Sequence, residues 1–201
     1  MFITLEGIDG AGKSTQVKLL AEALGTETLL LREPGGTPLG ERLREIVKDP
    51  DLEFGALAET MLFCAARSEL VATAIKPALA AGRDVVCDRF VDSTLAYQGV
   101  ARGLGIEPVE RLNEAAVAGL VPDLTVLLRI APELARRRAQ SRAEQTDDRF
   151  EGEGLEFQRR IATAFEAIAA ADPERVVAVE ADRDPGDVHV AILAAVEKAR
   201  P

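Results

Sequence analysis

The chain has 201 residues, of which 47% are hydrophobic and 29% are charged, and its formal net charge is −10 at pH 7. This length favours one domain, spanning residues 1–201, with enough apolar residues for a buried core. The acidic excess argues against non-specific binding to nucleic acid or to anionic membranes, so we expect neither as a partner.

The sequence also indicates a compartment. The first residues start a strand at once, so we expect no signal peptide, and no apolar run reaches the length of a membrane span. The two cysteines, Cys64 and Cys87, lie in apolar surroundings, which is typical of buried thiols in a reducing compartment. No Cys/His cluster has the spacing of a zinc site. These features together predict a cytoplasmic protein.

The first 24 residues carry the clearest signal. An apolar strand over residues 2–6 is followed by a glycine-rich loop and then by a helix that begins at Lys13. Gly7, Gly12, Lys13 and Ser14 complete the pattern G-x-x-x-x-G-K-[ST]. The glycines allow main-chain N–H groups to surround an anion, and the helix dipole points at the same anion. The motif therefore predicts a nucleoside triphosphate site, in which Lys13 reaches the outer phosphates and Ser14 holds Mg²⁺.

Strands and helices alternate along the rest of the chain. Hydrophobic periodicity predicts further strands at 27–32, 84–89, 123–130 and 175–180. It predicts helices at 39–47, 55–81, 93–99, 109–118, from Pro132 onward, 155–170 and 188–199. This alternation is typical of an α/β three-layer sandwich with a five-stranded, mostly parallel sheet. Ligands of such sheets bind where the strands end, here near Gly7, Glu33, Arg89 and Ile130.

Arginines concentrate after the fourth predicted strand. The segment holds Arg136, Arg137, Arg138, Arg142 and Arg149. A helix that leads into a polar segment flanked by glycines could form a mobile lid, at about 136–154, that brings a guanidinium to a transferring phosphoryl group. The alternative is an ordinary solvated helix face, because runs of charge are usually exposed.

Several segments, taken together and in this order, resemble the thymidylate (dTMP) kinase family over essentially the whole chain. They are the phosphate loop, Arg32–Thr37 (REPGGT), Asp88–Phe90 (DRF), Ser93–Gly99 (STLAYQG), Pro122–Thr125 and Asp148–Glu151. The family usually has tyrosine or histidine where this chain has Phe90, which is a mild departure that leaves the preceding acid–base pair intact. The resemblance implies a P-loop fold like that of nucleoside monophosphate kinases, and transfer of the γ-phosphoryl group of ATP to dTMP with Mg²⁺.

The resemblance also implies roles at the phosphates. The ATP-binding loop would comprise Gly7, Ile8, Asp9, Gly10, Ala11, Gly12, Lys13, Ser14 and Thr15. Asp9 would also approach the sugar and phosphate of the acceptor, although an Asx turn would explain an aspartate here as well. Arg89 would grip the acceptor phosphate, and Asp88 would hold Arg89 or a metal-bound water.

The resemblance also implies a pocket for the acceptor nucleotide. Phe63 and Arg67 are four residues apart on one helix face, so Phe63 could stack on a pyrimidine whose exocyclic oxygen Arg67 binds. The sequence alone favours a core position for Phe63, and the resemblance favours the pocket. The other implied pocket residues are Glu33, Pro34, Ser93, Thr94, Tyr97 and Gln98. Thr94 would face the base edge, and Tyr97 would exclude a ribose 2′-hydroxyl.

The chemistry of a phosphate acceptor predicts what the site lacks. A phosphate monoester is mostly dianionic at neutral pH, so it needs no general base, and the task is to bring two polyanions together. The single histidine, His189, is therefore expected to be structural or exposed. No basic residue lies between Ile8 and Ala11, so the resemblance implies that the lid supplies the catalytic arginine, with Arg138, Arg142 and Arg149 as the candidates.

Alternatives remain open at this point. The scaffold also suits another nucleoside-monophosphate or deoxynucleoside kinase, or a nucleotide-binding regulator without turnover. A GTPase is disfavoured because no N-K-x-D segment is present. The resemblance implies a homodimer, to which the apolar helix at 55–81 could contribute, although a core helix would have the same pattern.

Overall fold

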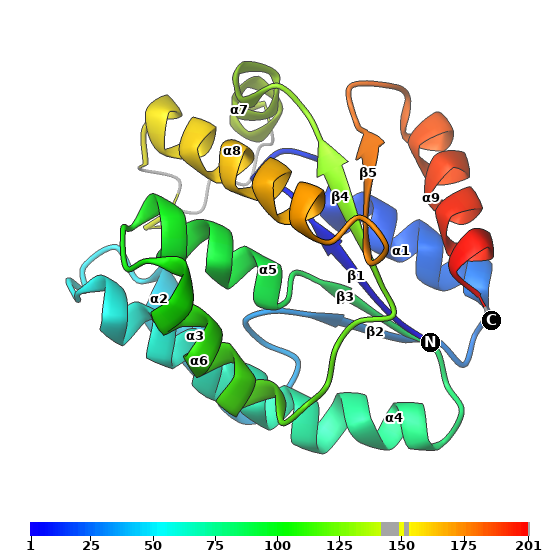
Figure 1. Cartoon of the computed structure of the whole chain (residues 1–201), viewed down its shortest axis with the longest axis horizontal. Helices are drawn as coiled ribbons and strands as arrows, with labels where there is room; N and C mark the ends of the chain where they lie inside the picture. The colour runs from blue at the N-terminus through cyan, green and yellow to red at the C-terminus, as the bar shows by residue number, and fades with distance from the viewer. Residues whose placement is uncertain (142–148, 151–152, 201) are drawn as a thin grey trace.

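The computed structural model describes residues 1–141, 149–150 and 153–200. Its five strands are β1 Phe2–Glu6, β2 Leu29–Arg32, β3 Val85–Asp88, β4 Leu124–Arg129 and β5 Val176–Glu180. They form one sheet in the order β2-β3-β1-β4-β5, and every neighbouring pair is parallel (Figure 1). The α/β prediction is confirmed, and all five strands end at the same edge of the sheet.

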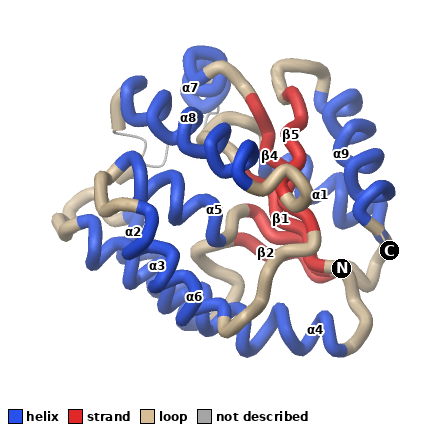
Figure 2. Tube along the Cα trace, viewed as in Figure 1, coloured by secondary structure: helices blue, strands red, loops and turns tan. Residues whose placement is uncertain are grey.

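Helices lie on both sides of this sheet (Figure 2). Helix α1 (Lys13–Leu24) packs against α9 (Pro185–Ala199), and the two lie together in Figure 1. The remaining helical elements are α2 Pro38–Lys48, α3 Ala56–Leu70, η1 Val71–Ile75, α4 Lys76–Ala80, α5 Val91–Thr94, η2 Leu95–Ala101, α6 Ile106–Val117, α7 Pro132–Gln140 and α8 Leu155–Ala171. The three-layer arrangement explains why β1 and most of β4 are buried, since a parallel sheet covered on both faces needs continuous apolar strands.

The predicted helix over 55–81 is present but not uniform. Its middle, η1, has the wider π-helical turn, in which the N–H of Lys76 donates to the carbonyl of Val71. Pro77 follows directly and has no N–H, and its ring would clash with the carbonyl four residues earlier in a regular α-helix. A local π-turn removes this clash while the helix continues. The sequence showed the proline but not how the backbone accommodates it.

The ends of the predicted strands are correct to within two residues. The helix predicted over 93–99 is longer, because α5 and η2 together run from Val91 to Ala101. The expected lid at about 136–154 is described only in part: α7 ends at Gln140, and Arg142 lies outside the described residues.

Candidate active site

A cavity of about 810 Å³ lies where the strands end. Its walls come from the segments that follow β1, β2 and β3, together with α3, η2, α7 and α8. This volume falls in the range of pockets that enclose small organic ligands. The predicted residues that line it are Asp9, Gly10, Gly12, Lys13, Ser14, Glu33, Pro34, Phe63, Arg67, Asp88, Arg89, Ser93, Thr94, Tyr97 and Gln98.

The glycine-rich loop forms one end of the cavity. Gly12 precedes α1 with a φ of +97°, in the left-handed region that glycine adopts without strain. Lys13 folds back over the loop, so that its Nζ donates to the carbonyls of Gly7 and Ile8, both at 2.9 Å. Burial, assisted by the positive charge of Arg89, lowers the pKa of Lys13 to about 8. A bound polyanion would favour the charged ammonium and would compete for it with the two carbonyls.

Helix α7 touches this loop at Gly10. Gly10 has a φ of +86°, and a Cβ atom there would lie 2.1 Å from the carbonyl oxygen of Ala135 in α7. Only glycine fits this approach. The neighbouring residue, Arg136, lines the cavity, so the contact places an arginine of the predicted lid beside the phosphate loop.

Arg89 joins Asp9 and Tyr97 in the wall of the cavity. Its Nη2 lies 2.5 Å from Asp9 Oδ1 and 3.1 Å from the Tyr97 hydroxyl, which in turn donates to Asp9 Oδ2 at 2.9 Å. Burial acts to raise the pKa of Asp9, but the charges of Arg89 and Lys13 prevail and lower it to about 2. Asp9 is therefore a carboxylate whose charge is balanced by cations, and it connects the phosphate loop to the segment after β3.

Ser14 and Asp88 lie together beside the loop. The Ser14 hydroxyl donates to Asp88 Oδ2 at 3.1 Å. Such oxygen atoms suit Mg²⁺, which proteins usually bind through one or two carboxylates together with phosphate oxygens and water. No group of three or more His, Cys, Asp or Glu residues with metal-site geometry is present among the described residues. A metal here would thus take its remaining ligands from phosphate oxygens of the nucleotide and from water.

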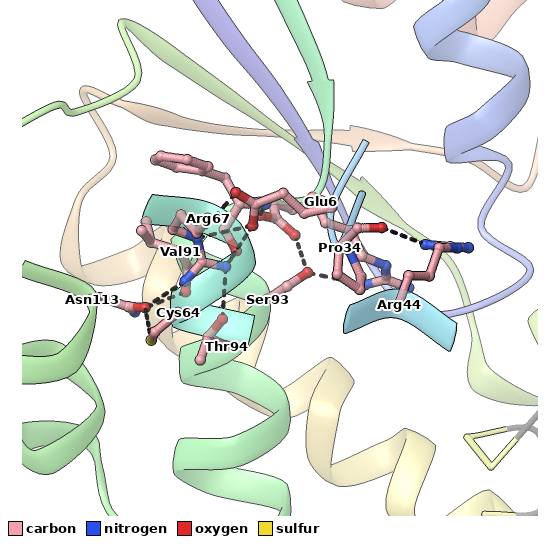
Figure 3. A network of polar contacts seen from close by, with 12 residues as sticks. Glu6, Pro34, Arg44, Cys64, Arg67, Val91, Ser93, Thr94 and Asn113 are labelled. Atoms are coloured by element: carbon pink, nitrogen blue, oxygen red, sulfur yellow. Dashed lines mark hydrogen bonds and ion pairs between the residues drawn. The ribbon is translucent and has the colours of Figure 1, made fainter. Parts of the chain in front are cut away.

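Arg67 and Glu33, which both line the cavity, form a buried ion pair. Arg67 is only 1% exposed, and its Nη2 lies 2.6 Å from Glu33 Oε2. The same guanidinium donates to the Thr94 hydroxyl at 2.9 Å, to the Phe90 carbonyl at 3.1 Å and to Asn113 Oδ1 at 2.5 Å (Figure 3). Burial acts to lower the pKa of Arg67, but the charge of Glu33 raises it. The guanidinium is therefore fixed in position and permanently charged.

Aromatic rings line one wall. The ring of Phe150 lies 6.1 Å from that of Phe63 and 6.4 Å from that of Tyr97, in edge-to-face geometry. Gln98 donates to the buried carboxylate of Glu59 at 2.8 Å. This wall combines flat apolar faces with fixed polar groups, which is what a nucleobase requires.

The two predicted lid arginines that the structure describes, Arg138 and Arg149, are not brought together. Arg138 Nη1 donates to the carbonyl of Ala181 at 2.7 Å, while the Arg149 guanidinium lies 3.8 Å from the centre of the Phe54 ring and 3.1 Å from Glu59. Neither residue lines the cavity, whereas Arg136 does. Residues two apart on a helix point about 200° apart, so when Arg136 faces the cavity, Arg138 faces away.

Sequence reasoning did not assign several other cavity residues to the site. They are Arg32, Arg44, Lys48, Arg136, Phe150, Glu153 and Gln158. Arg44 and Lys48 are four residues apart on α2, a spacing that would have grouped them on one face. Gln158 has a buried Oε1 without a hydrogen-bond partner in the described part of the chain, a feature that only the folded structure can reveal.

Comparisons with known proteins give a consistent result. The profile of the thymidylate kinase family matches residues 5–192. A thymidylate kinase of Synechococcus sp. (strain JA-2-3B'a(2-13)) is 50% identical over 100% of this chain and 96% of its own length. That of Deinococcus radiodurans is 43% identical over 98% of this chain and 97% of its own length. The crystal structure of thymidylate kinase from Ehrlichia chaffeensis superposes with a TM-score of 0.78 and 34% identity, covering 98% of both chains. The predicted P-loop kinase fold is confirmed.

Proposed function

The chain belongs to the thymidylate kinase family, and on this premise we propose that it transfers the γ-phosphoryl group of ATP to dTMP, giving ADP and dTDP for dTTP synthesis. The observation that carries the proposal is the shared cavity. The phosphate loop, Arg89, and the pair of Phe63 and Arg67 all line the same space. A triphosphate, an acceptor phosphate and a nucleobase therefore each have a binding group within one pocket.

At the donor end, residues 7–15 would hold the ATP phosphates, with Lys13 leaving the two carbonyls for the outer phosphates. Ser14 and Asp88 would hold Mg²⁺, which would supply positive charge to offset that of the phosphates. The chain's own task is to fix the two anions in line and to offset their charge.

At the acceptor end, Arg89 would bind the phosphate and Asp9 would orient Arg89. Phe63 and Phe150 would contact the faces of the base and sugar. Among the described residues, Arg67 Nη1 has one acceptor, Asn113, so its second N–H is the donor that we assign to a pyrimidine oxygen. Pro34, Ser93, Thr94, Tyr97 and Gln98 would complete the acceptor pocket, which is supported by their all lining the cavity.

No general base is needed, because the acceptor phosphate is already a dianion near neutral pH. The remaining requirement is a cation at the transferring phosphoryl group. We assign this role first to Arg136, because among the lid arginines that the structure describes it is the one that lines the cavity. Arg138, Arg142 and Arg149 remain candidates in a nucleotide-bound state, and the contacts of Arg138 and Arg149 would have to break first.

A coupled ADP-release assay tests the function. The enzyme is supplied with ATP and Mg²⁺ and with dTMP, dUMP, UMP, CMP, AMP or dGMP as the acceptor. We expect a clear preference for dTMP; a preference for another acceptor would instead identify a different nucleoside-monophosphate kinase. Binding of both nucleotides without release of ADP would indicate a regulator that lacks turnover.

The lid assignment has a matched control on the same helix. Arg136→Met should lower kcat by about 10²-fold or more, as loss of an electrostatic donor to the transition state does. Arg137→Met removes an adjacent, exposed arginine that does not line the cavity and should leave kcat unchanged. Equal effects of the two substitutions would contradict the assignment.

We also propose a homodimer in the cytoplasm. Leu57 and Met61 lie one turn apart on α3 and are 49% and 51% exposed, which favours a helix-packed interface. No helix in the described residues is long and apolar enough to cross a membrane. Sedimentation of the wild type and of Met61→Glu tests the dimer: the wild type should sediment as a dimer and the variant as a monomer.

A further inference from the structure

Glu6 is a fully buried acid that the proposed mechanism does not use. It is the last residue of β1, directly before the phosphate loop, and its exposure is 0%. Its carboxyl group turns away from the loop toward the segment after β3. Oε1 accepts the N–H of Phe90 at 2.7 Å, and Oε2 lies 2.5 Å from the Ser93 hydroxyl.

Both partners of Glu6 adjoin Arg89. Arg89 has a φ of +72°, in the left-handed region that residues other than glycine rarely adopt, and Phe90 follows it directly. Ser93 Oγ accepts from Arg89 Nη1 at 3.0 Å, and the same Nη1 donates to the Gly7 carbonyl at 3.2 Å. Glu6 thus fixes the main chain next to Arg89 and one of the acceptors for its guanidinium (Figure 3).

The charges around Glu6 fit a role inside the protein. Burial, followed by the nearby carboxylate of Asp92, raises the pKa of Glu6 to about 8, while Ser93 and Arg89 act in the opposite direction. The contacts of Glu6 do not depend on its protonation state. A protonated Oε2 would donate to Ser93 Oγ, and Oε1 would still accept the N–H of Phe90.

We propose that Glu6 is a positioning residue for the acceptor phosphate: through Phe90 and Ser93 it holds Arg89 in its left-handed conformation with the guanidinium in the cavity. The inference rests on the proposed role of Arg89 in phosphate binding. Strained backbone angles persist only where surrounding contacts impose them, and Glu6 supplies two of these contacts. Without them, Arg89 would relax to other conformations and leave the phosphate position.

Binding of dTMP and of thymidine separates this role from a general structural one. Thymidine has the same base and sugar but no phosphate, so it does not need Arg89. In Glu6→Ala we expect dTMP binding, measured by calorimetry, to weaken about tenfold or more, which corresponds to about 1.4 kcal/mol. Thymidine binding should change by less than about twofold. Equal weakening for both ligands, or for neither, would overturn the proposal.

Two further variants keep the test decisive if Glu6→Ala folds poorly. Glu6→Gln keeps an acceptor for the Phe90 N–H and a polar group facing Ser93, so it should restore most of the dTMP affinity. Asp92→Asn alters a buried acid of similar exposure that pairs with Arg175 instead, at 2.7 Å. Asp92→Asn should lower stability without changing the ratio of dTMP to thymidine affinity. A change in that ratio would mean that the effect of Glu6→Ala on dTMP binding reflects general destabilisation.

Coupling and kinetics complete the experiment. If Glu6 acts through Arg89, then Glu6→Ala combined with Arg89→Ala should bind dTMP no more weakly than Arg89→Ala alone. The KM for dTMP should rise in Glu6→Ala while the KM for ATP stays constant. A wild-type enzyme without dTMP kinase activity would contradict the proposed function, whereas an active wild type with an unchanged KM for dTMP in the variant would contradict only this inference.

Discussion

Glu33 Oε2 lies 2.6 Å from Arg67 Nη2, and the two side chains are only 3% and 1% exposed. Breaking a buried ion pair from one side leaves an uncompensated charge, which typically costs about 3–5 kcal/mol. Glu33→Gln should therefore lower the free energy of unfolding by about this amount and raise the KM for dTMP, because Arg67 loses its fixed position. Urea unfolding and the ADP-release assay measure the two effects.

An exposed pair provides the control. Glu107 and Arg111 also form an ion pair, but their side chains are 74% and 73% exposed. Glu107→Gln should change stability by less than about 1 kcal/mol and should not alter KM. Comparable losses in the two variants would mean that burial does not govern the importance of the Glu33–Arg67 pair.

Gly10→Ala should damage the donor side of the site. The new Cβ would meet the Ala135 carbonyl, so α7 would have to move away from the phosphate loop. We expect a higher KM for ATP and a kcat reduced by up to about 10²-fold, as a misplacement near 1 Å can cause. Gly82→Ala is the matched control: its φ of +75° imposes similar strain, but no atom of the described residues lies within 4 Å of the added Cβ. Full activity of Gly10→Ala would show that the contact is not needed.

Lys13→Ala should abolish most turnover while the fold persists. The substitution removes two hydrogen bonds to the main-chain carbonyls of Gly7 and Ile8, and it leaves the apolar core intact. We expect kcat to fall by about 10²–10³-fold, as for other electrostatic donors to a transition state. Circular dichroism should be unchanged. Lys18→Ala, an exposed position on the same helix, should be fully active. Near-normal turnover of Lys13→Ala would remove this lysine from the mechanism.

The pH dependence of stability should report on Glu6. Its pKa rises from 4.5 in the unfolded chain to about 8 in the folded protein. Within this window the folded state keeps a proton that the unfolded state releases, so this stabilisation is complete below pH 4.5 and is lost as pH rises toward 8. Glu6→Gln does not titrate and should lack the effect. The stability difference between wild type and variant, measured by urea unfolding, should decline with pH by at most about 1.4 kcal/mol per pH unit. A difference that is constant from pH 5 to pH 9 would contradict this pKa.

Much of the fold was predictable because local patterns determine it. A parallel sheet covered on both faces requires apolar strands, and such strands are visible as short runs between helical patterns. The glycine-rich loop that ends in Gly12, Lys13 and Ser14 is also a local pattern, and it indicates a strand–loop–helix arrangement. Where the chain departs from a regular element, as at the π-turn before Pro77, the sequence indicates an irregularity but not its form.

The site was predictable only where a motif is contiguous or a helix face is fixed. Phe63 and Arg67 share a face by their spacing, and both line the cavity. The sequence does not distinguish Arg136, which lines the cavity, from Arg138, which does not, because charge runs do not show which face of a helix meets the protein. The partnership of Glu33 with Arg67 joins two elements whose relative position is set by the whole sheet. The same holds for Glu6 and Ser93, which local spacing cannot connect.

The contact between Gly10 and Ala135 has a consequence for how binding energy is used. Because α7 contacts the phosphate loop at Ala135, the proposed assignment would place Arg136 beside the donor phosphates before an acceptor arrives. An arginine placed in this way contributes to ground-state affinity for ATP as well as to the transition state, whereas one that arrives only on closure contributes to turnover alone. Loss of Arg136 should thus raise the KM for ATP in addition to lowering kcat, and this result would make the lid arginine part of the nucleotide-binding site throughout the catalytic cycle.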